Sequence, residues 1–247
     1  MAVQKPKTAD LNPGPGFRIR KQIDRPARKI IEGLRAFDTP TISDMMNRLY
    51  TMAPAIKNLT APSKKIVGPA LTVRVYPGDN LMVHKSLDIA EPDDIVVIDA
   101  GGSSLNAVLG DLVSTKATHR KIAGFVIDGF IRDLPGIQKL NFPAFARGVT
   151  PIGPLHRGPG EINYPIQCGG IVVNPGDIIS GDLNGVVVIP QEIAANLLQR
   201  LEERKEAEAA YCEAVARGEF SNAWVDKMLT EAQCEIIENG QHVSKSI

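Results

Sequence analysis

Residues 110–133 read GDLVSTKATHRKIAGFVIDGFIRD, and they set the architecture expected for the whole chain. The first half of this stretch has a helical pattern, and the apolar run at 122–127 is typical of a buried strand. If Asp111 opens the helix and Arg132-Asp133 follows the strand, both ends lie at the same edge of a sheet. Two carboxylates and a guanidinium would then converge in one crevice. Such a trio can hold a divalent cation, a carboxylate substrate and a proton relay.

Strand-like and helix-like segments alternate on both sides of this stretch. The expected strands are residues 65–76, 95–99, 122–127 and 143–149, and the expected helices are residues 27–34, 81–90, 106–119 and 134–140. A further helix starts near Thr39-Pro40, with a Thr or Ser as its cap. Alternation of this kind predicts a layered α/β domain around a mixed sheet.

The sequence becomes rich in glycine and proline after residue 149. Short apolar runs at 170–173, 177–179 and 186–189 predict strands joined by tight turns. Residues 191–217 then form the longest helical pattern, and Gly218 is a plausible end for it.

The chain divides into three expected parts. Residues 1–26 lack periodicity and predict an extended arm, which could lie on a neighbouring subunit. Residues 27–218 form the main domain, and residues 219–247 form a helical C-terminal extension. The extension holds an amphipathic segment from Trp224 to about Ile237.

Composition argues against several classes of partner. The 247 residues carry 28 Lys+Arg and 28 Asp+Glu, so no overall positive field attracts nucleic acid. No apolar run approaches the ~20 residues needed to span a bilayer, so we expect no membrane partner. Three cysteines without CxxC spacing exclude a zinc ribbon or a disulfide framework, and a reducing cytoplasm fits best.

Each residue of the central trio has two interpretations. Asp133 stands before Leu134 and a proline, so it is a good helix N-cap, but one carboxylate oxygen can cap while the other binds a cation. Arg132 is either a surface cation or a grip for a bound anion. Asp111 is either a solvated residue favoured by the helix dipole or part of a site. The preceding GGSS, residues 101–104, could present backbone N–H groups to a small anion.

Histidine spacing and the known catalytic motifs indicate which metals and cofactors the chain could use. The four histidines show no paired spacing, which makes a histidine-ligated zinc site improbable, and oxygen ligands favour Mg²⁺ or Mn²⁺. The sequence contains no GxSxG motif, no Walker loop and no dinucleotide fingerprint. The glutamates of LEERKEAEAAY, residues 201–211, fit a solvated helix face.

Several motifs together resemble a known family. They are the spacing of Asp111 to Arg132-Asp133 and the segments GDNLMVHKSLDIAEPDDIVVIDAGG (78–102), VIDGFIRD (126–133) and CGGIVVNPGDIISGDLNGVVVIP (168–190). The chain is similar over about residues 28–215 to the 4-hydroxy-4-methyl-2-oxoglutarate / 4-carboxy-4-hydroxy-2-oxoadipate aldolases. These enzymes belong to the superfamily that contains the RNase E activity regulator RraA.

The resemblance implies a fold, an assembly and a reaction. The fold is the RraA-like swivelling β/β/α layered domain, and the assembly is a homotrimer or homohexamer with sites at subunit interfaces. The reaction is a divalent-metal-dependent retro-aldol cleavage of a 4-hydroxy-2-oxo acid to pyruvate, with oxaloacetate decarboxylation as a side activity. The alternatives are a dedicated β-keto acid decarboxylase or another lyase on the same scaffold, and a non-catalytic binding protein like the RNase regulator.

The resemblance also assigns roles to the central trio. Asp133 would ligate Mg²⁺ or Mn²⁺ within a water-rich shell, and Arg132 would bind the 2-oxo acid and steady the enolate oxygen. Asp111 would orient a metal-bound water for proton transfer. The regulator branch lacks the acid that matches Asp111, so this residue favours an enzyme.

Two further sets complete the site that the resemblance implies. The N–H groups of Leu112 and Val113, which follow Gly110 at the helix start, would hold the pyruvate carboxylate. A glutamate from a neighbouring subunit's C-terminal helix would complete the site, with Glu203 as the first candidate and Glu206 as the second.

Overall fold

The computed structural model describes residues 14–235, 237–238 and 241–242. The chain forms two compact units, Met1–Leu201 and Glu202–Ile247. The boundary between the units falls inside helix α6 (Ala194–Ala216), whereas the sequence suggested a limit at residue 218. The three-part division expected from the sequence stays a prediction.

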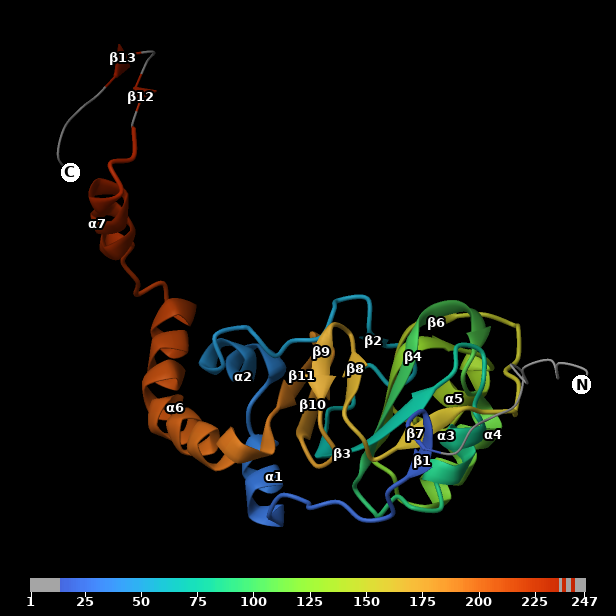
Figure 1. The fold of residues 1–247 in the computed structure, drawn as a ribbon. Coiled ribbons are helices and arrows are strands. Elements are labelled where there is room, and N and C mark those ends of the chain that lie inside the picture. The colour runs from blue at the N-terminus through green and yellow to red at the C-terminus, as the bar shows by residue number, and fades with distance from the viewer. Residues whose placement is uncertain (1–13, 236, 239–240, 243–247) are drawn as a thin grey trace, which may run out of the picture. The chain divides into compact units, whose positions relative to one another are not determined.

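The first unit is built on a nine-stranded mixed sheet (Figure 1), as expected. Four strands at its centre run parallel in the order β3-β4-β5-β6. Their bounds are Ile66–Val75 for β3, Ile95–Ala107 for β4, Gly124–Ile131 for β5 and Ala144–Val149 for β6. These strands consist largely of buried apolar residues because both faces of the sheet are covered.

Short antiparallel strands extend the sheet. Strand β7 pairs with β3, β2 pairs with β6, and the β10–β11 hairpin joins through β3. The β8–β9 hairpin forms a separate small sheet. The bounds are Lys57–Asn58 for β2, Gly160–Ile162 for β7, Ile166–Cys168 for β8, Ile171–Val173 for β9, Ile178–Asp182 for β10 and Gly185–Ile189 for β11.

Helices and hairpins cover opposite faces of the parallel strands (Figure 1). The helices α3 (Leu81–Ser86), α4 (Asp111–His119) and α5 (Leu134–Lys139) pack on one face, over side chains such as Ile98 and Ile127. The β8–β11 strands pack on the other face, over side chains such as Val97 and Val126. A third apolar cluster joins β10 and β11 to α1 (Arg28–Leu34), α2 (Thr39–Met45) and the start of α6. This is the layered β/β/α arrangement that the sequence led us to expect.

Strand β4 is longer than the predicted strand 95–99, and this shortens the following helix. The strand continues through residues 101–104 with two register shifts against β5. The N–H groups of Ala107 and Val108 donate to Ile152 O and Phe130 O at 2.8 Å, so the chain stays extended there. The prediction of a helix from residue 106 is therefore wrong, and α4 begins at Asp111.

Two smaller expectations also change. Helix α2 is capped by Asp38, whose carboxylate accepts from Thr41 N–H at 3.1 Å, rather than by a Thr or Ser. The arm contributes strand β1 (Phe17–Ile19), which pairs in parallel with β7 of its own chain. Arg25 holds the following segment through the buried Asp94. This part of the arm therefore lies on its own sheet, and residues 1–13 lie outside the described residues.

The second unit begins within α6, which follows the short 3₁₀ turn η1 (Gln191–Ile193). Gly218 adopts a left-handed conformation just after α6, as a helix-ending glycine should. The expected amphipathic segment forms a shorter helix, α7 (Ala223–Glu231). Two short strands, β12 (Ile237–Glu238) and β13 (Gln241–His242), pair beyond it.

Candidate active site

Asp111, Arg132 and Asp133 lie together at the carboxyl edge of the parallel sheet. Strands β4 and β5 are parallel neighbours, α4 begins at Asp111, and β5 ends at Ile131. The Arg132 N–H donates to Leu109 O at 3.0 Å, which ties the end of β5 to the turn before α4. The edge of an α/β sheet at its strand carboxyl ends is the usual place for a ligand. Asp111 therefore opens a helix and Arg132-Asp133 follows a strand at the same sheet edge, as the sequence predicted.

Close approaches through glycines show how tightly the trio is assembled. A Cβ on Gly110 would collide with Asp133 Oδ2, and one on Gly136 would come within 2.8 Å of Asp111 Oδ2. The start of α4 thus faces the start of α5. At the start of each helix, an aspartate carboxylate lies against a glycine of the other helix start. The glycine has only a hydrogen atom where a side chain would otherwise collide with the carboxylate.

Asp133 has an unusual backbone for a helix N-cap. Its φ of 55° and ψ of 36° are left-handed, and its side chain makes no capping hydrogen bond. Instead, Asp133 Oδ2 lies 3.3 Å from Arg132 Nε. Left-handed non-glycine residues cost free energy and concentrate at functional sites. Asp133 occupies the N-cap position without capping, so its carboxylate remains available for another partner.

The Arg132 side chain lies between Asp133 and Gly153. Its guanidinium lies against Gly153, where an added Cβ would stand 2.5 Å from Nη1. The segment carrying Gly153 is fixed by the Asn106 amide, which donates to Gly153 O at 2.8 Å. The side chain is 41% exposed, so it remains accessible to an anion in solvent.

The start of α4 provides free backbone donors. The first bond within the helix runs from Ser114 N–H to Gly110 O at 3.1 Å, so the preceding N–H groups of Leu112 and Val113 have no acceptor inside the helix. The Leu112 side chain is exposed, whereas Val113 packs into the core and anchors the turn. Unsatisfied N–H groups and the helix dipole favour an anion at this position.

The glycine pair 101–102 does not join this group. Gly102 instead faces the ion pair between Asp128 and Arg147, since a Cβ there would lie 3.7 Å from Asp128 Oδ1 and 3.8 Å from Arg147 Nε. Residues 101–104 lie in the bulged continuation of β4 rather than at a helix start, and their role as an anion cradle stays a prediction.

Sequence reasoning missed Gly136 and Gly153, which together with Gly110 leave room for the trio. Gly136 lies in the first turn of α5, where glycine weakens a helix relative to alanine. An unfavourable glycine inside a helical pattern is a signal of close packing, and it could have directed attention to this contact.

The donor set suits a hydrated divalent cation. Within the described residues, no cluster of three or more His, Cys, Asp or Glu side chains could enclose a metal. Asp111 and Asp133 provide carboxylate oxygens at one edge, and hard cations such as Mg²⁺ are commonly held by one or two carboxylates with several waters retained. The residues present therefore fit such an ion.

Glu203 belongs to the part of α6 in the second unit. Its proposed contribution to a neighbouring subunit's site stays a prediction.

These features define a class: a layered β/β/α protein with an acid–arginine–acid site at the carboxyl edge of a mixed sheet. The family model described as RraA-like, Aldolase/RraA, matches residues 39–188. That match spans more than half of the chain, so the chain belongs to the Aldolase/RraA family.

Individual relatives agree with this assignment. The chain is 41% identical over 200 residues to a Halalkalibacterium halodurans protein named "Putative 4-hydroxy-4-methyl-2-oxoglutarate aldolase", covering 81% of this chain and 95% of the relative. A Hahella chejuensis protein of the same name is 32% identical, over 63% of this chain and 94% of the relative. The crystal structure of Streptomyces coelicolor RraAS2, described as an unusual member of the RNase ES inhibitor RraA protein family, superposes with a TM-score of 0.70. It is 25% identical and covers 76% of this chain and 99% of its own. The RraA-like fold inferred from the sequence is confirmed.

No helix among residues 14–235 combines the length and apolar character needed to cross a membrane.

Proposed function

We propose that this protein is a divalent-metal-dependent carbon–carbon lyase that cleaves a 4-hydroxy-2-oxo acid to pyruvate. The observation that carries the proposal is the meeting of Asp111, Arg132 and Asp133 at one sheet edge, through contacts that only glycines permit. The aldolase names of the relatives support it.

Mg²⁺ or Mn²⁺ held by Asp133 would polarise the 2-oxo group of the substrate and lower the energy of the enolate. Both ions accept the oxygen donors present, so the choice between them is part of the test.

The remaining chemistry falls to residues of the chain. Leu112 and Val113 N–H groups bind the substrate carboxylate, and Arg132 places its positive charge beside the 2-oxo oxygen. Asp111 holds the water that takes the proton from the 4-hydroxyl group. As that proton leaves, the C4–O bond becomes a carbonyl and the C3–C4 bond breaks. Its electron pair forms the pyruvate enolate, a proton returned to C3 gives pyruvate, and the C4 fragment leaves as a second carbonyl product. A preorganised cation where negative charge develops is often the largest catalytic contribution.

We also propose a homotrimer or homohexamer, in which Glu203 of one subunit reaches the site of another. Exposed apolar side chains lie at the start of α4 and near the carboxyl ends of β4 and β6, and they support an interface there: Leu105, Leu112, Val149, Ile152 and Leu155. Three free cysteines agree with a reducing compartment such as the cytoplasm.

The test measures pyruvate release in an assay coupled to lactate dehydrogenase. The substrates are 4-hydroxy-4-methyl-2-oxoglutarate and oxaloacetate, and each is assayed with Mg²⁺, with Mn²⁺ and with EDTA. Losing one charge-stabilising donor typically costs ~3 kcal/mol, so Arg132→Ala should slow turnover about 100-fold. Asp133→Ala should remove metal-dependent release. The surface variant Arg120→Ala is the matched control. Near-normal turnover of either site variant, with the fold intact by circular dichroism, would refute the assignment.

The similarity to an RNase ES inhibitor relative supports a second candidate, a non-catalytic binding protein. Capture of RNase E on the immobilised chain, together with no pyruvate release from any substrate, would favour it. Release from oxaloacetate alone would indicate a dedicated decarboxylase.

A further inference from the structure

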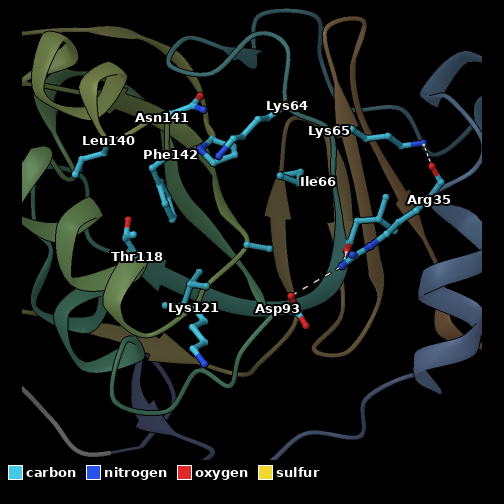
Figure 2. Close-up of a pocket in the computed structure, with 14 residues that line it drawn as sticks. Arg35, Lys64, Lys65, Ile66, Asp93, Thr118, Lys121, Leu140, Asn141 and Phe142 are labelled. Carbon is cyan, nitrogen blue, oxygen red and sulfur yellow. Dashed lines mark hydrogen bonds and ion pairs between the residues drawn. The ribbon is translucent and has the colours of Figure 1, made fainter.

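A cavity lies at the amino edge of the parallel strands, opposite the edge that carries the candidate active site. Figure 2 shows the residues that line this cavity. It has a volume of about 450 Å³ and is lined by Ile66 at the start of β3 and by residues just before β5 and β6. Because β5 has eight residues, the two edges are about 25 Å apart. The cavity is therefore separate from the Asp111–Arg132–Asp133 group.

The cavity has an apolar floor and a cationic rim. Ile66, Ile122 and Phe142 are buried beneath it. The charged residues that line it are Arg35, Lys64, Lys65 and Lys121, together with the acidic Asp93. A hollow of this size with an apolar base and a few charged groups has the ordinary form of a small-molecule site.

Two of these cations are already engaged with the protein. Lys65 donates to Arg35 O at 3.1 Å and to Phe37 O, and its burial lowers the pKa of its ammonium group. Arg35 donates to Val67 O at 3.3 Å and lies 4.0 Å from Asp93. Figure 2 shows the Arg35 side chain extending from the end of α1 toward Asp93.

The other two, Lys64 and Lys121, form no ion pair within the described part of the chain and are exposed. Asp93 lines the cavity, and Asp182 and Asp38 act on Lys65, so the surplus of positive charge on the rim comes from Lys64 and Lys121. The carboxyl ends of α4 and α5 lie nearby and reduce this surplus through their dipoles without cancelling it.

The end of α4 fixes the backbone of Lys121, because Lys121 N–H donates to Thr118 O and Ile122 N–H donates to Ala117 O. Lys121 has a φ of 60°, a left-handed conformation that favours glycine, and it follows the end of α4. A basic side chain could be there to offset the helix dipole, but α4 already ends with Lys116, His119 and Arg120. Asn141 holds the same position after α5, where Phe142 N–H donates to Ile137 O. The two helix ends therefore bring Lys121 and Asn141 to the cavity wall.

We propose that this cavity binds a small organic dianion: a molecule with two carboxylates, or with a phosphate, on a short apolar body. The apolar part rests on Ile66 and Phe142. The charged groups meet Lys64 and Lys121, with Arg35 able to turn from Asp93 toward the ligand.

The experiment measures binding of adipate and phenyl phosphate to the full chain by calorimetry and saturation-transfer NMR. Adipamide and benzyl alcohol serve as uncharged counterparts. Both charged probes, or one of them, should bind, and binding should weaken as salt is raised to about 0.2 M because exposed charges are screened. The two probes separate a carboxylate ligand from a phosphate ligand. Equal binding of the uncharged counterparts, or no binding of either anion at millimolar concentration, would overturn the proposal.

Variants locate the binding. Lys64→Gln combined with Lys121→Gly should weaken the anion about tenfold or more, the effect expected for losing charge-assisted hydrogen bonds. Lys121→Gly also relieves the left-handed backbone, so unfolding cannot account for the loss. Lys57→Gln, an exposed lysine elsewhere, should bind as the parent does. Unchanged affinity in the double variant, or an equal loss in Lys57→Gln, contradicts the assignment.

Discussion

Asp133 combines an unfavourable backbone with an available carboxylate, which suggests that function rather than stability keeps it. Asp133→Gly should leave the free energy of unfolding unchanged or raise it by up to about 1 kcal/mol, because glycine adopts φ near 55° freely. The same variant should lose metal-dependent pyruvate release. Urea unfolding and the coupled assay measure the two effects. Asn47→Gly, another left-handed residue far from the trio in sequence, is the control and should change stability without changing activity.

Gly110 leaves the space that Asp133 occupies. Gly110→Ala should cost about 1–3 kcal/mol of stability, as overpacking does, and should lower turnover at least about tenfold by displacing the carboxylate. The backbone itself accepts alanine, since Gly110 has an extended conformation with φ −144°. Lys116→Ala on the exposed face of α4 controls for general effects on that helix. Full activity in Gly110→Ala would mean that the close approach to Asp133 has no functional weight.

Glu161 gives a pH-dependent contribution to stability. Burial alone would raise the pKa of this carboxyl, but the Gly16 N–H, the 2.7 Å bond from Arg18 and the charge of Arg74 outweigh it and lower the pKa. A lowered folded-state pKa gives stability that is present above the unfolded value, about 4.3, and lost as pH falls through the folded value. Glu161→Gln should therefore destabilise the protein at pH 7 and much less near pH 3, as urea unfolding at both pH values would show. An equal loss at both would contradict the sign.

A bidentate ion pair helps to hold the extended segment before α1, beside the bond from the Asn163 amide to Arg20 O. Arg25 Nε and Nη2 lie 2.9 and 2.8 Å from the two oxygens of Asp94, whose side chain is fully buried. Arg25→Ala would leave that carboxylate unpaired and should cost about 3 kcal/mol. Arg28→Ala removes an exposed pair with Glu32 and should cause no measurable change in the same denaturation experiment. Equal effects of the two substitutions would show that Asp94 finds other partners.

Some helix and strand boundaries agree with the local sequence pattern, whereas the helix expected at residues 81–90 ends at Ser86. The expected strand 65–76 and the helix 27–34 match β3 and α1 closely. Strand β4 did not, because its extension depends on partners that are remote in sequence, including Ile152 and Phe130. Periodicity in one segment carries no information about such pairing.

The assembly proposed for the whole molecule predicts that its apolar patch is buried between subunits. Leu105→Glu with Ile152→Glu should shift the mass measured by light scattering toward a monomer, because an interface cannot bury unpaired charges. Pyruvate release should fall as the monomer forms, because the proposed site needs a residue of the neighbouring subunit. Leu183→Glu, at a more exposed leucine in the β10–β11 turn, should leave the mass unchanged. A monomeric parent protein would rule out the assembly.

The sequence by itself determined the alternation of elements, the placement of Asp111 and Arg132-Asp133 at the ends of a helix and a strand, and the family. These features depend on local periodicity and on parallel strands sharing an edge. The tertiary structure alone decided that Gly110 and Gly136 admit the two carboxylates and that residues 101–104 belong to the sheet. It alone brought Lys64 and Lys121 to one cavity. The physical reason is that packing between segments distant in the chain is set by the shapes of all the elements at once, which no single stretch encodes.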